Sequence, residues 1–247
     1  MINFQDKKIV TTSWDDGYTT DKKLCSILKT YGIKGTIYSP LEYPEYEILN
    51  YDELKELSKD FEIGSHTYSH KILPLLSEEE IMTELLKSKE KLEEITSNDV
   101  ISFCYPDGKY DQHVVDCVKK SGYKGARTTS LFRTNISNPF LMGTTIQAVD
   151  RMILSKGKQI LNTDNKNFGN YLLSGGRIFK NWHSLAISSF DYVMKNGGIW
   201  HLWGHSKEIE DNNDWKQLEK VLEYVSNNGK KNNAEFLTNG EILTEIF

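Results

Sequence analysis

Short apolar stretches and amphipathic segments alternate along the whole chain. The apolar stretches are rich in β-branched and aromatic side chains, and their length and composition predict strands at 8–14, 35–38, 61–64, 100–105, 124–129, 142–149 and 199–203. Between most of them, apolar residues recur at spacings of three, four and seven, which is the period of a helix with one buried face. The clearest such pattern is formed by Leu218, Val221, Leu222 and Val225.

Capping residues mark the ends of several predicted helices. Ser77 and Glu80 have the spacing of a capping box, and Asn50 and Asp111 are suited to cap the helices that follow them. Gly32 follows an apolar helical pattern directly, which predicts the end of that helix.

The regular alternation of strands and helices predicts parallel strand pairing through right-handed crossovers. Six or seven such units favour a closed or nearly closed β/α barrel in one domain over residues 1–247. The alternative is a doubly wound open sheet, but the sequence carries no glycine-rich dinucleotide-binding fingerprint. The polar stretch around 155–180 predicts a surface insertion.

Charge and composition narrow the range of partners. With 30 basic and 35 acidic side chains the net charge is −5, and no long basic block is present. Nucleic acid and anionic membrane surfaces are therefore not expected as main partners. No apolar run approaches the roughly 18 residues of a membrane span, and the amino terminus lacks the apolar core of a signal peptide. Three cysteines without a Cys-x-x-Cys pair fit a reduced, cytoplasmic protein.

Polar residues that suit metal chemistry follow three of the predicted strands. Asp15 and Asp16 end the first, His66 and His70 follow the third, and His205 follows the last. In a parallel β/α barrel the carboxyl ends of all strands face the same side, where active sites are built. Two imidazoles and one carboxylate form a typical catalytic zinc set with an open position for water, and cobalt or nickel accepts the same ligands. With Asp16 as the third ligand, Asp15 is free to act as general base on a water acidified by the ion.

Three segments together resemble the first three motifs of the polysaccharide deacetylase (NodB-homology) family. This family is similar to carbohydrate esterase family four. The three segments are Ser-Trp-Asp-Asp-Gly at 13–17, Gly-Ser-His-Thr-Tyr-Ser-His at 64–70 and Phe-Cys-Tyr-Pro-Asp-Gly at 103–108. The resemblance is firmest over 8–127 and resumes over 198–206. It implies an α/β fold of the distorted (β/α)₇ barrel type and metal-dependent removal of an acyl group from an N-acylated sugar.

The resemblance also implies roles for individual residues. Asp15 matches the family's general base, and His205 matches the acid that protonates the leaving amine. The metal ligands of the family correspond to Asp16, His66 and His70. His201 competes with His205 for the acid role, but we expect it to be a core histidine.

The third motif departs from the family pattern at two positions. Cys104 stands where an arginine is common, and Asp107 stands where a tyrosine usually supplies a backbone N–H to the oxyanion. A backbone donor does not depend on the side chain, so Asp107 is expected to retain that role. The missing arginine normally pairs with the base, and we hypothesise that Arg127 replaces it from another strand. The fourth motif of the family has no clear counterpart.

The expected function is therefore the hydrolytic removal of an acetyl (N-acyl) group from an N-acetylated amino sugar or from a polysaccharide or glycan precursor. The expected cofactor is a divalent metal ion, with Zn²⁺ first and Co²⁺ or Ni²⁺ as alternatives. A deformylase or amidase for lipid-linked or nucleotide-linked aminosugars, or for another small amide, is the first alternative, because cell-wall polymer lies outside the cytoplasm. A non-catalytic sugar-binding barrel is the second, suggested by Cys104 and Asp107.

Overall fold

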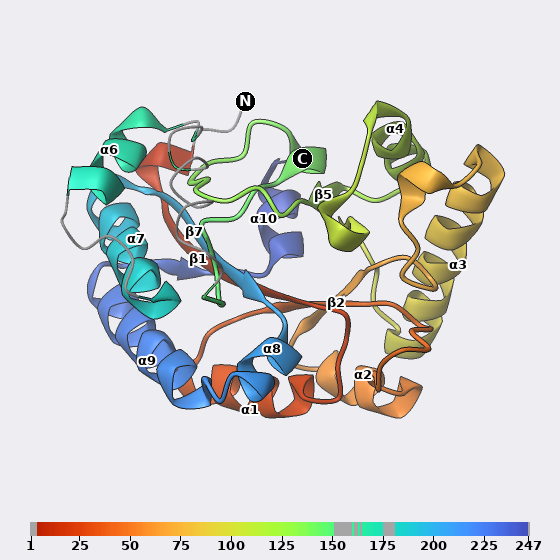
Figure 1. Ribbon diagram of the computed structural model, residues 1–247, viewed down its shortest axis with the longest axis horizontal. Helices are drawn as coiled ribbons and strands as arrows, with labels where there is room; N and C mark the ends of the chain where they lie inside the picture. Colours follow the sequence, from red (N-terminus) through yellow and green to blue (C-terminus); the bar gives the residue numbers. More distant parts are fainter. Residues whose placement is uncertain (1–3, 151–159, 161–162, 164, 175–180, 247) are drawn as a thin grey trace.

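The computed structural model describes residues 4–150, 160, 163, 165–174 and 181–246. Its centre is one curled parallel sheet with the strand order β5-β4-β3-β2-β1-β7-β6, and β8 pairs with β1 outside this path (Figure 1). The strands are β1 (Lys8–Asp15), β2 (Thr36–Ser39), β3 (Glu62–Ser65), β4 (Ser102–Cys104), β5 (Gly125–Arg127), β6 (Ile146–Gln147), β7 (Gly198–Gly204) and β8 (Glu235–Phe236).

Residues 142–148 connect the two edges of this sheet. The N–H of Met142 donates to the carbonyl of Ala126 in β5 at 2.9 Å, and the N–H of Ala148 donates to the carbonyl of Trp203 in β7 at 2.8 Å. The sheet therefore curls round into a barrel in which β5 and β6 do not pair directly but are bridged by residues 142–148. The predicted distorted (β/α)₇ barrel is confirmed, and the doubly wound open sheet is not formed.

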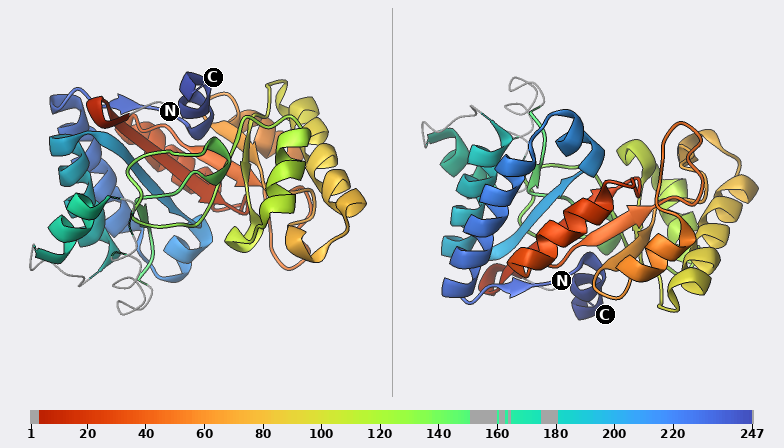
Figure 2. Two further views of the ribbon diagram at one scale, coloured as in Figure 1. Left: turned by 90° about the horizontal axis from the view of Figure 1, so that it is seen from above. Right: turned by 90° about the horizontal axis from the view of Figure 1, so that it is seen from below.

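Most of the helices cover the outer face of the curled sheet (Figures 1 and 2), while the last one, α10, lies against the amino end of the barrel. They are α1 (Asp21–Tyr31), α2 (Tyr51–Leu57), α3 (Glu78–Thr96), α4 (Gln112–Lys120), α6 (Lys166–Ser174), α7 (Trp182–Asn196), α8 (Ser206–Asp211), α9 (Trp215–Lys231) and α10 (Asn239–Ile246). Among the described residues, none of the helices combines the length and the apolar character that crossing a bilayer requires.

The predicted helix caps are present. Asn50 and Ser77 each form a complete capping box, at the start of α2 and α3 respectively. The side chain of Asp111 accepts the N–H of Val114 at the start of α4. Gly32 ends α1 in the left-handed conformation, with φ 65°.

Several short elements have no counterpart among the predicted ones. These are α6, α8, α10 and β8; α6 lies within the predicted insertion around 155–180, and its residues Phe168 and Leu172 are buried. Residues 155–159, 161–162, 164 and 175–180 of the predicted insertion lie outside the described residues. The assignment of 1–247 to one domain with an insertion there stays a prediction.

The interior of the barrel changes from apolar to polar along β1. At the amino end Ile9 packs in a small apolar cluster with Ile199 and with Ile242 of α10. The next inward side chains of β1 are polar, and each bonds to another element of the barrel: Thr11 to Asn239 of α10, Ser13 to His201 of the neighbouring β7 and Asp15 to Arg127 of β5. Because successive strand residues point to opposite faces, every second residue of β1 faces the interior. These inward residues change from apolar, at the cluster around Ile9, to polar at the carboxyl end.

Candidate active site

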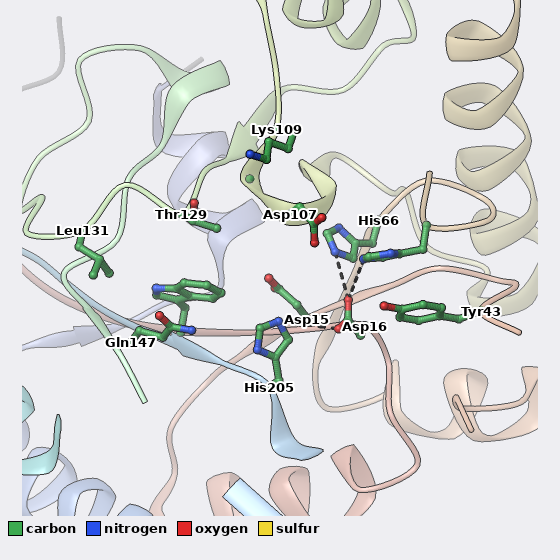
Figure 3. Close-up of a pocket in the computed structure, with 13 residues that line it drawn as sticks. Asp15, Asp16, Tyr43, His66, Asp107, Lys109, Thr129, Leu131, Gln147 and His205 are labelled. Carbon is green, nitrogen blue, oxygen red and sulfur yellow. Dashed lines mark ion pairs between the residues drawn. The ribbon is translucent and has the colours of Figure 1, made fainter. Parts of the chain in front are cut away.

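The predicted site residues gather at the carboxyl end of the barrel (Figure 3). They lie at the ends of β1, β3, β4, β5 and β7. A pocket of about 470 Å³ opens between them, and the predicted residues that line it are Asp15, Asp16, His66, His70, Asp107 and His205. Arg127 lies behind this wall, fully buried. Four separate segments of the chain thus bring the predicted polar side chains to one cavity.

A sharp turn after β1 aims the two aspartates in different directions. Asp16 and Gly17 both have left-handed backbones, with φ 75° and 61°. A Cβ atom at Gly17 would lie 2.2 Å from the hydroxyl oxygen of Ser39, so only glycine fits there. Asp15 therefore points into the barrel, while Asp16 faces the loop that follows β3.

Asp16, His66 and His70 form a compact group of metal-ligand type. One oxygen of Asp16, Oδ1, lies 3.4 Å from Nε2 of His66 and 3.1 Å from Nε2 of His70, as the dashed lines of Figure 3 mark. The three ligand atoms lie within 4.8 Å of one another, and the residues are buried or nearly so. Burial alone would raise the pKa of Asp16, but the hydrogen bonds of His66 and His70 and the charges of His66 and His205 hold that pKa well below its usual value. A carboxylate and two imidazoles that converge in this way fit a divalent cation.

Neighbouring groups orient both imidazoles. Nδ1 of His66 lies 2.8 Å from the carbonyl oxygen of Cys104, which can only accept, so Nδ1 carries a proton and Nε2 is the atom that can present a lone pair to a cation. The ring of His70 stacks on Tyr43, with centroids 4.3 Å apart and planes 16° from parallel.

A second trio, Asp15, His66 and Cys104, also has ligand atoms within 4.8 Å. It is the poorer metal site for two reasons. Burial raises the pKa of the Cys104 thiol well above its usual value, which disfavours the thiolate that a metal needs. Asp15 is also already paired with Arg127. The metal is therefore expected at Asp16, His66 and His70.

Arg127 reaches Asp15 from the strand next to Cys104. Cys104 and Arg127 are direct register partners of β4 and β5. The guanidinium forms a buried ion pair with Oδ1 of Asp15, and its Cζ lies 4.7 Å from the ring centre of Trp203. In the family pattern the arginine stands at position 104. Here Cys104 occupies that position, and Arg127 supplies a guanidinium from the neighbouring strand. That Arg127 serves catalysis in this way stays a prediction.

The two histidines of β7 and its end have different surroundings. His201 is buried with Nε2 2.8 Å from the hydroxyl of Ser13, and burial lowers its pKa well below the usual value, so it is a neutral core histidine. Nδ1 of His205 lies 2.8 Å from a carboxylate oxygen of Glu208, and its Nε2 lies 3.7 Å from Asp16. Burial lowers the pKa of His205, but Glu208, Asp15 and Asp16 outweigh it and raise that pKa above its usual value. His205 is thus the better placed of the two to carry a proton.

Asp107 sits on the turn after β4 at the edge of the pocket. Its backbone is left-handed, with φ 54° and ψ 11°, within a 3₁₀ turn over Pro106–Gly108. Its side chain is exposed. The role of its backbone N–H in stabilising an oxyanion stays a prediction.

Sequence reasoning missed several residues that contact the site. Glu208 follows His205 by three positions, and that i, i+3 spacing on a helix was the available signal. Tyr43 lies in the long connection between β2 and α2, where no periodic pattern places it. Gln147 lines the pocket next to Trp203, its register partner on β7.

The comparisons with known proteins agree on one family. The profile of the polysaccharide deacetylase family matches residues 3–126. YxkH of Bacillus subtilis (strain 168), a candidate polysaccharide deacetylase, is 29% identical over 128 residues, which are 50% of this chain and 45% of YxkH. The match therefore spans less than half the length of this curated relative.

Solved structures with the same fold match this chain over nearly its whole length. PdaA of Bacillus subtilis, a family 4 carbohydrate esterase, has a TM-score of 0.61 at 16% identity, over 98% of this chain and 83% of its own. BA3943 of Bacillus anthracis, a CE4 family pseudoenzyme, has a TM-score of 0.56 at 17% identity, over 97% of this chain and 66% of its own. At these identities the likeness concerns the fold alone. Because the family profile matches half of the chain and spans the turns that carry Asp15, Asp16, His66 and His70, the chain belongs to the polysaccharide deacetylase family.

Proposed function

We propose that this chain is a metal-dependent hydrolase that removes the acetyl group from an N-acetylated amino sugar. The observation that carries the proposal is the convergence of Asp16, His66 and His70 on one point, with the carboxylate of Asp15 beside them in the same pocket. Membership of the polysaccharide deacetylase family supports the substrate class.

A divalent cation held by Asp16, His66 and His70 would supply Lewis-acid polarisation of the acyl carbonyl and a water of lowered pKa. Zinc is the ion that we propose first, since two imidazoles and one carboxylate are a frequent ligand set of catalytic zinc. Cobalt and nickel accept the same ligands.

The proton transfers are assigned to two residues at the ends of the neighbouring strands β1 and β7. Asp15 accepts the proton of the attacking water, and its ion pair with Arg127 holds the carboxylate in one orientation. His205, whose pKa is raised, donates a proton to the departing amine nitrogen. The backbone N–H of Asp107 is proposed to donate to the carbonyl oxygen as negative charge develops on it.

A non-catalytic sugar-binding barrel has a precedent in fold, because BA3943 is a pseudoenzyme. In this chain, however, the residues that we propose as base, metal ligands and acid all line the same pocket, and mere binding of a sugar requires no such set. A deformylase or amidase for another aminosugar uses the same chemistry and differs only in substrate.

Removal of the metal is expected to abolish activity. Purified protein with Zn²⁺ or Co²⁺ should release acetate from N-acetylglucosamine oligomers. Dialysis against a chelator should lower the rate about 10³-fold, because several kcal/mol of transition-state stabilisation is lost at 1.36 kcal/mol per factor of ten. Zn²⁺ or Co²⁺ added back should restore the rate.

A parallel panel of soluble N-formyl and nucleotide-linked aminosugars separates the deacetylase from the alternative hydrolases. Acetate release that is unaffected by thorough chelation would contradict the metal-dependent mechanism. Tight sugar binding with no release from any member of the panel would favour the sugar-binding barrel.

The charge of Glu208 is expected to set the alkaline limit of activity. Replacing Glu208 with glutamine removes a negative charge that raises the pKa of His205, so that pKa should fall. His205 must be protonated to act as the acid, and activity is lost as the pH rises through its pKa. The alkaline limb of the pH profile of kcat/KM should therefore move to lower pH in Glu208→Gln. Glu210→Gln, the same change at an exposed position of α8, should leave the limb in place. If the alkaline limb of Glu208→Gln lies at the same pH as that of the wild type, His205 is not the acid.

A further inference from the structure

The loop that carries both candidate metal-ligand histidines is held from outside by one buried carboxylate. This carboxylate belongs to Glu84 of α3, whose side chain has no role in the chemistry above and is 8% exposed. One of its oxygens, Oε2, accepts the backbone N–H groups of Tyr68 at 3.0 Å and Ser69 at 2.9 Å. The other, Oε1, accepts the hydroxyl of Ser69 at 2.7 Å and lies 3.3 Å from Nζ of Lys71.

The loop needs such support because its backbone is unusual. Thr67 and His70 both have left-handed conformations, with φ 64° and 52°, although neither is glycine. Residues other than glycine keep such conformations only where their surroundings over-determine them. The carbonyl of Tyr68 contributes as well, since it accepts the N–H groups of Leu41 and Glu42, each at 2.9 Å.

A second contact ties the same helix to the start of the loop. The hydroxyls of Ser65, the last residue of β3, and Ser88, four residues after Glu84 on α3, lie 2.8 Å apart. Helix α3 therefore contacts the segment 65–71 at both of its ends, through Ser88 and Glu84. Between these contacts the imidazoles of His66 and His70 both face Asp16.

We propose that Glu84 is a positioning residue for the metal site: its carboxylate fixes the 66–70 loop so that both imidazoles point at Asp16. The inference rests on the proposed function, because it assumes that a cation binds there. Glu84 itself is not a ligand, and it acts through the backbone of the loop that carries two of the ligands.

The affinity of the purified protein for Zn²⁺ and Co²⁺ tests this proposal. Groups that orient metal ligands typically contribute 10–100-fold to affinity, and Glu84→Ala should therefore weaken both Kd values by about that factor. Glu84→Gln should fall between the wild type and Glu84→Ala, because its amide oxygen can still accept the N–H groups of Tyr68 and Ser69. Glu90→Ala, which removes the same charge from an exposed position of α3, should bind like the wild type.

The absorption spectrum of the Co²⁺ form supplies a readout that a loss of general stability would not move. In Glu84→Gln, at a pH and temperature where circular dichroism shows it fully folded, the ligand-field bands should shift in position or intensity because one imidazole is misaligned. Wild-type affinity and spectrum in both Glu84 variants would overturn the inference and leave the proposed function intact. Should Glu84→Ala fail to fold, Glu84→Gln decides by the same criteria. Absence of Zn²⁺ and Co²⁺ binding by the wild type would remove the proposed function and this inference together.

Discussion

Asp15→Asn is expected to lower kcat for acetate release by about 10²–10⁴-fold, the usual contribution of a general base, while the protein still binds one metal ion. Asparagine has the shape of aspartate and can accept a hydrogen bond from Arg127, but it cannot take up the proton of the attacking water. Asp16, on the other side of the turn, keeps its contacts with His66 and His70. Activity falls and metal content does not.

The measurement combines kcat with metal analysis on the same preparation, normalised to the folded fraction. Asp16→Asn is the matched control, since it makes the same chemical change one residue away at a predicted ligand. It should lower metal affinity, whereas Asp15→Asn should not. Equal loss of metal in both variants would mean that Asp15 is a ligand and not the base.

Arg127→Ala is expected to have the second large effect, on stability as well as on turnover. The guanidinium is fully buried, and its removal leaves the carboxylate of Asp15 in the barrel interior without a compensating charge. Breaking a buried ion pair in this way typically costs about 3–5 kcal/mol of unfolding free energy. Urea denaturation should report that loss. The kcat of the folded fraction should collapse, because Asp15 is no longer held in place, while metal content stays intact.

The register of β4 and β5 provides a rescue experiment for this prediction. Because Cys104 and Arg127 lie side by side on neighbouring strands, an arginine at position 104 can reach the same carboxylate. The double variant Cys104→Arg/Arg127→Ala should recover stability and turnover relative to Arg127→Ala. Unchanged kinetics in the single variant would show that the ion pair is not required for the reaction.

Much of this fold was predictable from sequence because its information is local. The β-branched run that ends at Asp15, the capping boxes at Asn50 and Ser77, and the glycine after α1 each follow from the properties of a few adjacent residues. Elements such as β8 and α10 lack such a signal. They exist because they complete pairings or cover the barrel end, as Ile242 does.

The candidate site likewise contains residues that local patterns predict and contacts that they do not. Residues at strand ends could be expected to meet, because parallel strands share one carboxyl edge. The pairing of Arg127 with Asp15 could be hypothesised from the missing arginine at position 104, but the register of β4 and β5 that brings it about is not specified by any local pattern. Tyr43 against His70 and Glu84 against the 66–70 loop are contacts between distant segments, and only the folded structure reveals them.

The central claim is that Asp16, His66 and His70 bind one divalent cation at the carboxyl end of the barrel. Anomalous diffraction from crystals grown with Zn²⁺, recorded on both sides of the zinc absorption edge, tests it most directly. The account predicts a single strong peak bonded to one oxygen of Asp16 and to Nε2 of both histidines, with the carboxylate of Asp15 outside the coordination sphere. No peak at this position in zinc-loaded crystals, or a peak bonded to Asp15 and Cys104 instead, would contradict it.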